Sequence, residues 1–179
     1  MDKIQVKDKT FTVSIPEADI LKEVKRVAAE INRDLEGRNP LFLAVLNGSF
    51  IFAADLLREV TIPCEISFVK LASYEGVFST GEIREVIGLN TDITGRAVVI
   101  VEDIIDSGLT MVHMIETLKK HNPSSIDVCS LLVKPGNLKV NLDVKYKCLE
   151  IPNDFIVGYG LDYDGFGRNT RSIYTIVEE

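Results

Sequence analysis

The spacing of apolar residues predicts helices and strands that alternate along the chain. Over residues 17–35, apolar side chains recur every three or four positions, which predicts an amphipathic helix, and Ser14 and Pro16 precede it as start signals. Leu41–Leu46 is a short, wholly apolar run that stops at an Asn-Gly pair, which predicts a buried strand. The same criteria predict a further set of elements: helices at 50–57 and 109–121, and strands at 64–71, 97–101, 126–133, 155–157 and 173–177.

This order of elements predicts an α/β fold with a mainly parallel central sheet flanked by helices. Strands that alternate with helices are joined by right-handed crossovers, and ligands in such sheets bind beyond the carboxyl ends of the strands. The residues that follow Leu46, Val101 and Val133 are therefore the first candidates for function. Segment 73–88 is rich in Gly, Ser, Thr and charge without a sustained apolar period, so it predicts a functional loop or a flexible hairpin.

The composition predicts one soluble globular domain over residues 1–179. Of these residues, 46% are hydrophobic and 26% are charged, and a chain of this length can bury a sizeable core. The net charge of −7 argues against a nucleic-acid partner, because such proteins usually present a basic face. Cys64, Cys129 and Cys148 have neither disulfide nor metal-ligand spacing. Without a signal peptide or a run long enough to cross a bilayer, we expect a cytoplasmic protein with no membrane partner.

An acidic pair and a glycine-containing turn follow the apolar strand at 97–101. Glu102 and Asp103 come first, and the segment Asp106-Ser107-Gly108-Leu109-Thr110 then leads into a helix. Adjacent carboxylates are costly unless a metal ion or ligand hydroxyls pair with them. Gly108 permits a tight turn, and a helix start offers free N–H groups and a positive dipole end. The combination predicts a sugar-phosphate site, with the phosphate on the turn and the sugar hydroxyls on the carboxylates.

A structural interpretation of these residues stays open when they are taken singly. Asp106 or Ser107 could cap the helix, and the acidic pair could be a solvated strand end. The longer string from Val98 to Thr110 is harder to explain in that way. It resembles the phosphoribosyl-pyrophosphate-binding signature of the type I phosphoribosyltransferases: an apolar strand, two acidic residues, two apolar residues, then Asp-Ser/Thr-Gly-x-Thr. The signature does not choose the base, because transferases for several bases and some regulatory proteins share it.

Other segments resemble the hypoxanthine-guanine phosphoribosyltransferases, in the same order and over nearly the whole chain. The resemblance implies that Asn47 and Gly48 form a pyrophosphate-binding turn with a cis peptide before Asn47. It implies that Ser73 and Tyr74 open a flexible lid over about 73–88, and that the N- and C-terminal segments form a small hood. By themselves, Asn-Gly is an ordinary turn pair and Ser-Tyr in a loop means little.

The same resemblance extends to a set of base-binding residues. Lys134 matches a lysine that hydrogen-bonds the purine 6-oxo group, and an ammonium favours a carbonyl over the amino group of adenine because it only donates. Phe155 would stack on the purine, and the backbone of Ile156 would contact its edge. Asp162 would help to hold a second magnesium ion, and Arg168 would reach the pyrophosphate. The structural alternatives are a solvated lysine, a core phenylalanine, a surface aspartate and a surface arginine.

These likenesses imply a purine salvage enzyme that uses Mg²⁺ and 5-phosphoribosyl 1-pyrophosphate to convert hypoxanthine or guanine to IMP or GMP, with release of pyrophosphate. Glu102 and Asp103 would grip the ribose hydroxyls and a metal ion, and Asp106 would take the proton from the purine N7. Asn47 and Leu109 stand where some relatives have lysine. The alternative is a non-catalytic regulatory protein of the same fold that binds phosphoribosyl nucleotides. The resemblance also implies a homodimer or a homotetramer.

Overall fold

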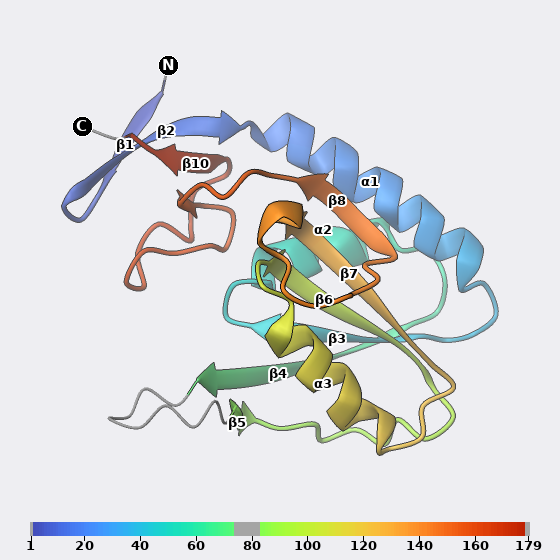
Figure 1. Cartoon of the computed structure of the whole chain (residues 1–179). Helices are drawn as coiled ribbons and strands as arrows, with labels where there is room; N and C mark the ends of the chain where they lie inside the picture. Colours follow the sequence, from blue (N-terminus) through green and yellow to red (C-terminus); the bar gives the residue numbers. More distant parts are fainter. Residues whose placement is uncertain (1, 74–82, 178–179) are drawn as a thin grey trace.

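A six-stranded sheet forms the body of the protein. The computed structural model describes residues 2–73 and 83–177 (Figure 1). The strands of this sheet follow the order β5-β4-β3-β6-β7-β8. β4, β3, β6, β7 and β8 are parallel, and β5 is antiparallel to β4. Their bounds are β3 Leu41–Leu46, β4 Glu65–Ser73, β5 Ile83–Ile87, β6 Ala97–Ile105, β7 Ser125–Val133 and β8 Tyr146–Glu150. The predicted α/β class is confirmed.

Helices cover both faces of this sheet. α1 (Glu17–Asp34) and α2 (Phe50–Glu59) pack on one face, and α3 (Leu109–Lys119) packs on the other. Because side chains alternate along a strand, β6 contributes Val99 and Val101 to the first core and Val98 and Ile100 to the second. A strand buried on both faces has to be apolar throughout, which explains the unbroken run at its start.

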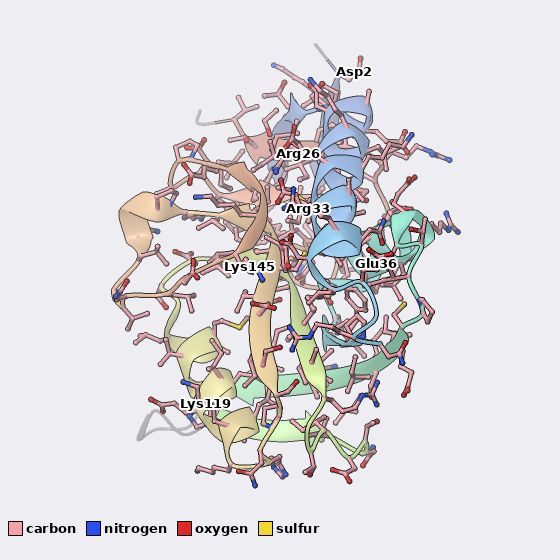
Figure 2. All side chains as sticks on the ribbon, turned by 90° about the vertical axis from the view of Figure 1, so that its right-hand side faces the viewer. Asp2, Arg26, Arg33, Glu36, Lys119 and Lys145 are labelled. Carbon is pink, nitrogen blue, oxygen red and sulfur yellow. The ribbon has the colours of Figure 1, made fainter. Side chains whose placement is uncertain are left out.

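Arg26 ties α1 to the outer strand of the sheet. Its guanidinium donates to the carbonyl of Lys147 at 2.8 Å and to that of Cys148 at 3.3 Å. The same group pairs with Glu23 and Glu30 on its own helix, at 2.7 and 2.8 Å. Figure 2 shows Arg26 and Arg33 along α1. Arg26 therefore fastens α1 to β8, the outermost strand on that side of the larger sheet.

The two chain ends meet in a second, smaller sheet, which we call the hood. Its strand order is β1-β2-β10-β9, and its bounds are β1 Lys3–Val6, β2 Lys9–Ile15, β9 Ile156–Val157 and β10 Ile173–Ile176. Phe11 and Val157 are fully buried at its centre. Figure 1 shows the hood at the end of the larger sheet toward which the parallel strands run.

The structure differs from the sequence-based expectations at several elements. β1, β2 and β8 were not predicted, although β2 alternates apolar Phe11, Val13 and Ile15 with small polar residues. Residues 83–87 form β5, which pairs antiparallel with β4, in keeping with the hairpin that was one of the two alternatives for segment 73–88. Residues 74–82 lie outside the described part of the chain. Among residues 2–73 and 83–177, no helix has the length and apolar character that a membrane crossing requires.

β6 is longer than predicted, and the acidic pair lies inside it rather than beyond its end. The strand runs through to Ile105. The alternation of its side chains between the two faces of the sheet shifts by one residue at the pair. Ile104 packs on the face covered by α1 and α2, and Ile105 packs on the face covered by α3. Hydrogen bonding to β7 therefore continues past the two carboxyl groups, which lie near the carboxyl end of β6.

Candidate active site

The predicted site residues lie at one edge of the larger sheet. Asn47 follows β3, Asp106 follows β6 and Lys134 follows β7, and all three strands are parallel neighbours. From β3 the chain moves outward to β4, whereas from β6 it moves the other way to β7 and β8. In open α/β sheets such a reversal of direction leaves a crevice at the carboxyl ends of the strands, where ligands bind.

The acidic pair places two carboxyl groups next to each other at this edge. Glu102 and Asp103 are both half-buried. The Asp103 carboxylate accepts a hydrogen bond from the N–H of Ile104 at 2.8 Å, and Glu102 Oε1 accepts one from the N–H of Asp103 at 3.1 Å. Burial and the neighbouring Asp103 carboxylate raise the pKa of Glu102 well above its usual value. Ionising Glu102 is therefore costly here, and a nearby cation, or sugar hydroxyls that donate hydrogen bonds, would stabilise its charged form.

Two glycines bring the loop after β3 against the acidic pair and the C-terminal segment. The Leu46–Asn47 peptide is cis, as the resemblance implied. Gly48 lies against the Asp103 carboxylate, and its carbonyl oxygen lies against Gly160, so neither glycine has room for a Cβ. Gly160 also has a positive φ of 100°, which favours glycine. The predicted pyrophosphate turn, the acidic pair and the segment at 158–168 thus meet at Gly48.

The turn from Asp106 to Thr110, which we call the phosphate cradle, opens toward solvent beside the acidic pair. Gly108 adopts a φ of 79° and precedes α3, whose first N–H groups have no partners within the helix. Val140 and Leu138 pack where a Cβ of Gly108 would be. A cavity of about 220 Å³ is lined by residues 102–108, Thr110 and Met111. Acidic pair and cradle therefore share one hollow, large enough for a sugar phosphate.

Asp106 and Lys134 face each other across the ends of β6 and β7. Lys134 Nζ lies 3.6 Å from Asp106 Oδ2. The lysine is 8% exposed and the aspartate side chain 54% exposed. Asn137 donates to Asp106 Oδ1 at 2.8 Å, and Lys134 donates to Asn153 Oδ1 at 3.4 Å. An ammonium carries three donors, so Lys134 retains capacity for one more acceptor.

Phe155 belongs to an aromatic cluster beneath the hood and still presents a free surface. Its ring is 44% exposed. It meets Tyr163 edge-on at a centroid distance of 5.6 Å and an angle of 90°, and it lies 6.0 Å from Phe11. Tyr163 in turn donates to Asp8 Oδ1 at 2.9 Å. Because 44% of the residue stays exposed beside these two contacts, Phe155 has surface left for a stacking ligand.

Asp162 and Arg168 are paired with each other. Arg168 Nη2 lies 2.8 Å from Asp162 Oδ1, and Nη1 donates to the carbonyl of Gly160 at 2.7 Å. The second oxygen of Asp162 accepts from the N–H of Gly165 at 2.7 Å. Each side chain uses only part of its hydrogen-bonding capacity in these contacts, so a ligand that reaches this turn could still bind to either of them.

The remaining predicted residues are described only in part. Ile156 is buried in β9 and pairs with Thr175 of β10. Ser73 is the last residue of β4 and lies opposite Ile83. Tyr74 lies outside the described residues. The exposed fraction of Leu109 is 52%, and its N–H donates to Ser107 Oγ at 3.4 Å.

Comparison with known proteins assigns the chain to a family. The model of the phosphoribosyl transferase domain matches residues 16–164. The chain belongs to this family. A hypoxanthine-guanine phosphoribosyltransferase of Streptococcus agalactiae serotype V is 39% identical over 164 residues, which cover 91% of each chain. The resemblance inferred from the sequence and the predicted enzyme class are therefore confirmed.

Solved structures agree with this family assignment. A hypoxanthine-guanine phosphoribosyltransferase from Bacillus anthracis matches with a TM-score of 0.87 at 40% identity, over 93% of this chain and 97% of that one. A hypoxanthine phosphoribosyltransferase from Staphylococcus aureus matches with a TM-score of 0.88 at 34% identity, over 93% of this chain and 91% of that one. The chain thus spans nearly the full length of these phosphoribosyltransferases.

Sequence analysis did not single out Asn137, Asn153 or Gly160, which touch the predicted site residues of this phosphoribosyltransferase. Asparagines near Pro and Gly are ordinary turn residues, so Asn137 and Asn153 stand out only once they touch Asp106 and Lys134. Gly160 had a weak signal, since the Gly-Tyr-Gly segment at 158–160 suggests a strained turn. Its contact with Gly48 joins positions more than a hundred residues apart and leaves no local pattern.

Proposed function

We propose that this phosphoribosyltransferase converts hypoxanthine or guanine to IMP or GMP with 5-phosphoribosyl 1-pyrophosphate as donor. The observation that carries the proposal is the 3.6 Å approach of Lys134 Nζ to Asp106 Oδ2 beside the phosphate cradle. A 6-oxopurine presents O6 and N7 next to each other on one edge. An ammonium donor and a carboxylate acceptor placed side by side suit a carbonyl oxygen and a nitrogen that loses its proton.

The chemistry of Lys134 favours 6-oxopurines over adenine. Its ammonium only donates, and adenine has an amino donor at the position where hypoxanthine and guanine have a carbonyl. Because Lys134 is buried, an unmatched donor facing it would lose its hydration without gaining a partner. Phe155 would stack on the purine face, and the backbone of Ile156 would contact its edge, as the family resemblance implies.

The donor would lie across the acidic pair and the cradle. Ser107, Gly108, Leu109 and Thr110 would hold its 5-phosphate through backbone N–H groups and hydroxyls at the start of α3. Glu102 and Asp103 would accept hydrogen bonds from the ribose hydroxyls. Asn47 and Gly48 would turn toward the pyrophosphate, which Arg168 would reach from the opposite segment. The 220 Å³ hollow shared by pair and cradle supports this arrangement.

The residues present fit magnesium only together with the substrate. Within residues 2–73 and 83–177, no three or more His, Cys, Asp or Glu side chains gather where they could hold a metal ion. Mg²⁺ commonly takes one or two carboxylates and completes its shell with water and substrate phosphates. The adjacent carboxyl groups of Glu102 and Asp103 support one cation at this place, and Asp162 is the candidate for a second ion, as the family resemblance implies. When bound, magnesium would neutralise the departing pyrophosphate.

The protein's own groups would then act on a sugar and a base already held in place. Glu102 and Asp103 keep the ribose oriented and place negative charge near the anomeric carbon, which becomes positive as its bond to pyrophosphate breaks. Purine N9 attacks this carbon while Asp106 accepts the proton from N7. Ser73 and Tyr74 would open a lid that excludes water from the reactive sugar. We also propose a cytoplasmic enzyme that assembles as a homodimer or homotetramer.

A substrate panel tests the proposal. Purified protein is mixed with 5-phosphoribosyl 1-pyrophosphate, Mg²⁺ and hypoxanthine, guanine, xanthine or adenine, and pyrophosphate release is followed. We expect turnover with hypoxanthine or guanine, none with adenine, and loss of turnover when EDTA removes the metal. If no base supports pyrophosphate release, the proposal that this protein is an enzyme is wrong. Calorimetric binding of the magnesium-donor complex without turnover would instead support the non-catalytic regulatory alternative.

A further inference from the structure

Two asparagine side chains connect Asp106 to Lys134. Asn137 Nδ2 donates to Asp106 Oδ1 at 2.8 Å and to Asn153 Oδ1 at 2.6 Å. Asn153 Oδ1 also accepts from Lys134 Nζ at 3.4 Å, and Lys134 Nζ lies 3.6 Å from Asp106 Oδ2. The four side chains close a ring, in which carboxylate and ammonium are joined directly and also through the two amides.

Hydrogen-bonding capacity determines how each amide in this ring is oriented. An asparagine amide nitrogen has two donors, and Asn137 uses both on oxygen acceptors. Turning this amide by half a rotation would place its oxygen against those two oxygens. The carbonyl oxygen of Asn153 has two lone pairs, and two donors approach it. The donor at position 137 and the acceptor at position 153 are therefore not interchangeable.

Asp106 depends on Asn137 for its orientation. Its side chain is 54% exposed, so packing does not fix its rotation. Among the side-chain hydrogen bonds of the described residues, the one from Asn137 is the bond that reaches Asp106. Lys134 approaches the other oxygen at an ion-pair distance of 3.6 Å, which constrains direction less than a hydrogen bond does. One carboxylate oxygen is thus held, and the other remains beside Lys134.

The segment that carries Asn137 also packs on the phosphate cradle. Asn137 ends a single helical turn, η1 (Pro135–Asn137), and its N–H donates to the carbonyl of Lys134 at 3.0 Å. Two residues later the N–H of Lys139 donates to the carbonyl of Ser107 at 3.0 Å. Asn153 approaches from the loop between β8 and β9, shortly before Phe155. The ring therefore connects the proposed phosphate site with Lys134 and with the loop before Phe155, and these two residues are proposed to bind the base.

We infer that Asn137 and Asn153 are positioning residues for the transfer reaction. They hold the Asp106 carboxylate and the Lys134 ammonium in the relative orientation that meets N7 and O6 of the purine. Neither asparagine acts on the reacting atoms itself, and each works through the group that it hydrogen-bonds. The inference rests on the proposed function, because it needs Asp106 and Lys134 in their proposed roles.

The same substitution at the two positions tests this inference, because aspartate has nearly the shape of asparagine but only accepts. Asn137→Asp would place carboxylate oxygens, which cannot donate, against Asp106 Oδ1 and Asn153 Oδ1. We expect kcat with guanine to fall about tenfold or more, since small misplacements of a catalytic group are costly. The KM for 5-phosphoribosyl 1-pyrophosphate should change less than about twofold because the cradle is untouched. Asn153→Asp retains an acceptor for Asn137 and Lys134, so its loss of kcat should be clearly smaller than that of Asn137→Asp.

A matched control and two measurements separate positioning from folding. Asn141→Asp makes the same change at an exposed residue away from the ring, and it should leave kcat and KM unchanged. Thermal unfolding of every variant should give similar midpoints, so that a loss of kcat is not a loss of folded protein. Wild-type kcat in Asn137→Asp, or equal losses of kcat in Asn137→Asp and Asn153→Asp, would overturn the inference about the asparagines and leave the proposed function intact. A wild-type protein without turnover on any 6-oxopurine would overturn the proposed function and the inference with it.

Discussion

Asp103 and Gly48 are in direct contact, although one belongs to β6 and the other to the loop after β3. The Oδ2 and Cγ atoms of Asp103 occupy the space that a Cβ on Gly48 would need. On its other side, the carbonyl of Gly48 lies against Gly160. This glycine therefore sets how closely the proposed pyrophosphate turn can approach the acidic pair.

The contact predicts that Gly48→Ala disables the enzyme. The added methyl group has to displace either the Asp103 carboxylate or the turn itself, and both are proposed to hold the donor. We expect kcat/KM for 5-phosphoribosyl 1-pyrophosphate to fall about 100-fold, in line with misplacements of about 1 Å in other active sites. Steady-state kinetics measures this. Gly37→Ala is the control: its φ of 74° disfavours alanine and should cost stability, but nothing lies within 4 Å of a Cβ there, so its kinetics should match the wild type. Wild-type kinetics in Gly48→Ala would show that the contact is unimportant.

The role of Asp106 predicts a specific kinetic defect in Asp106→Asn. The amide has the shape of the carboxylate but cannot accept the N7 proton, so kcat should fall by about 10²–10⁴-fold. The KM for 5-phosphoribosyl 1-pyrophosphate should change little, because the cradle N–H groups remain. Asp143→Asn, at an exposed carboxylate on the loop before β8, serves as control. Unchanged turnover in Asp106→Asn would exclude this residue as the general base.

Tyr159 anchors the segment that carries Gly160. Its side chain is buried, and its hydroxyl donates a short hydrogen bond of 2.5 Å to Asp55 on α2. Burial and the Asp55 carboxylate raise the pKa of Tyr159, so the hydroxyl stays protonated as a donor. Tyr159→Phe should lower the free energy of unfolding by about 1–3 kcal/mol, the usual cost of leaving a hydrogen-bonded charge without its partner.

Urea unfolding of Tyr159→Phe measures this loss against Tyr174→Phe. Tyr174 is half-buried in the hood, and its hydroxyl forms no side-chain hydrogen bond within the described residues. A loss in Tyr174→Phe as large as that in Tyr159→Phe would mean that the bond to Asp55 adds nothing specific.

The buried cysteines predict how stability depends on pH. Burial raises the pKa of Cys148 to about 12, from an ordinary value of 9.0, and raises that of Cys129 in the same direction. A pKa that is higher in the folded state means that the folded state favours the neutral thiol. This contribution is present below about pH 9 and is lost as the pH rises toward 12. The free energy of unfolding should therefore decline over that range.

Replacing one buried thiol tests the assignment. Cys148→Ala should show a weaker decline in the free energy of unfolding between about pH 9 and 12 than the wild type does. Labelling with a maleimide at neutral pH should modify the half-buried Cys64 first, and Cys129 and Cys148 only when the protein unfolds. Rapid labelling of Cys148 in the folded protein would contradict its burial.

Much of the larger sheet was predictable because its strands carry local patterns. β3 and the first part of β6 are buried on both faces, so their residues are apolar without interruption. Of the hood strands, β9 and β10 lie where strands were predicted, at 155–157 and 173–177, whereas β1 and β2 were missed. β2 is stabilised by β10, which lies at the other end of the chain. Its existence therefore depends on a partner that no local pattern reveals.

The sequence by itself determined the α/β class, the acidic pair and the cradle from Asp106 to Thr110, because each depends on residues close together in the chain. Only the tertiary structure decided that Asn137 and Asn153 join Asp106 to Lys134 and that Gly48 lies between Asp103 and Gly160. These contacts connect separate loops whose approach is set by the packing of the strands and helices beneath them. Their side chains have no shared spacing along the chain, so no local pattern could have revealed them.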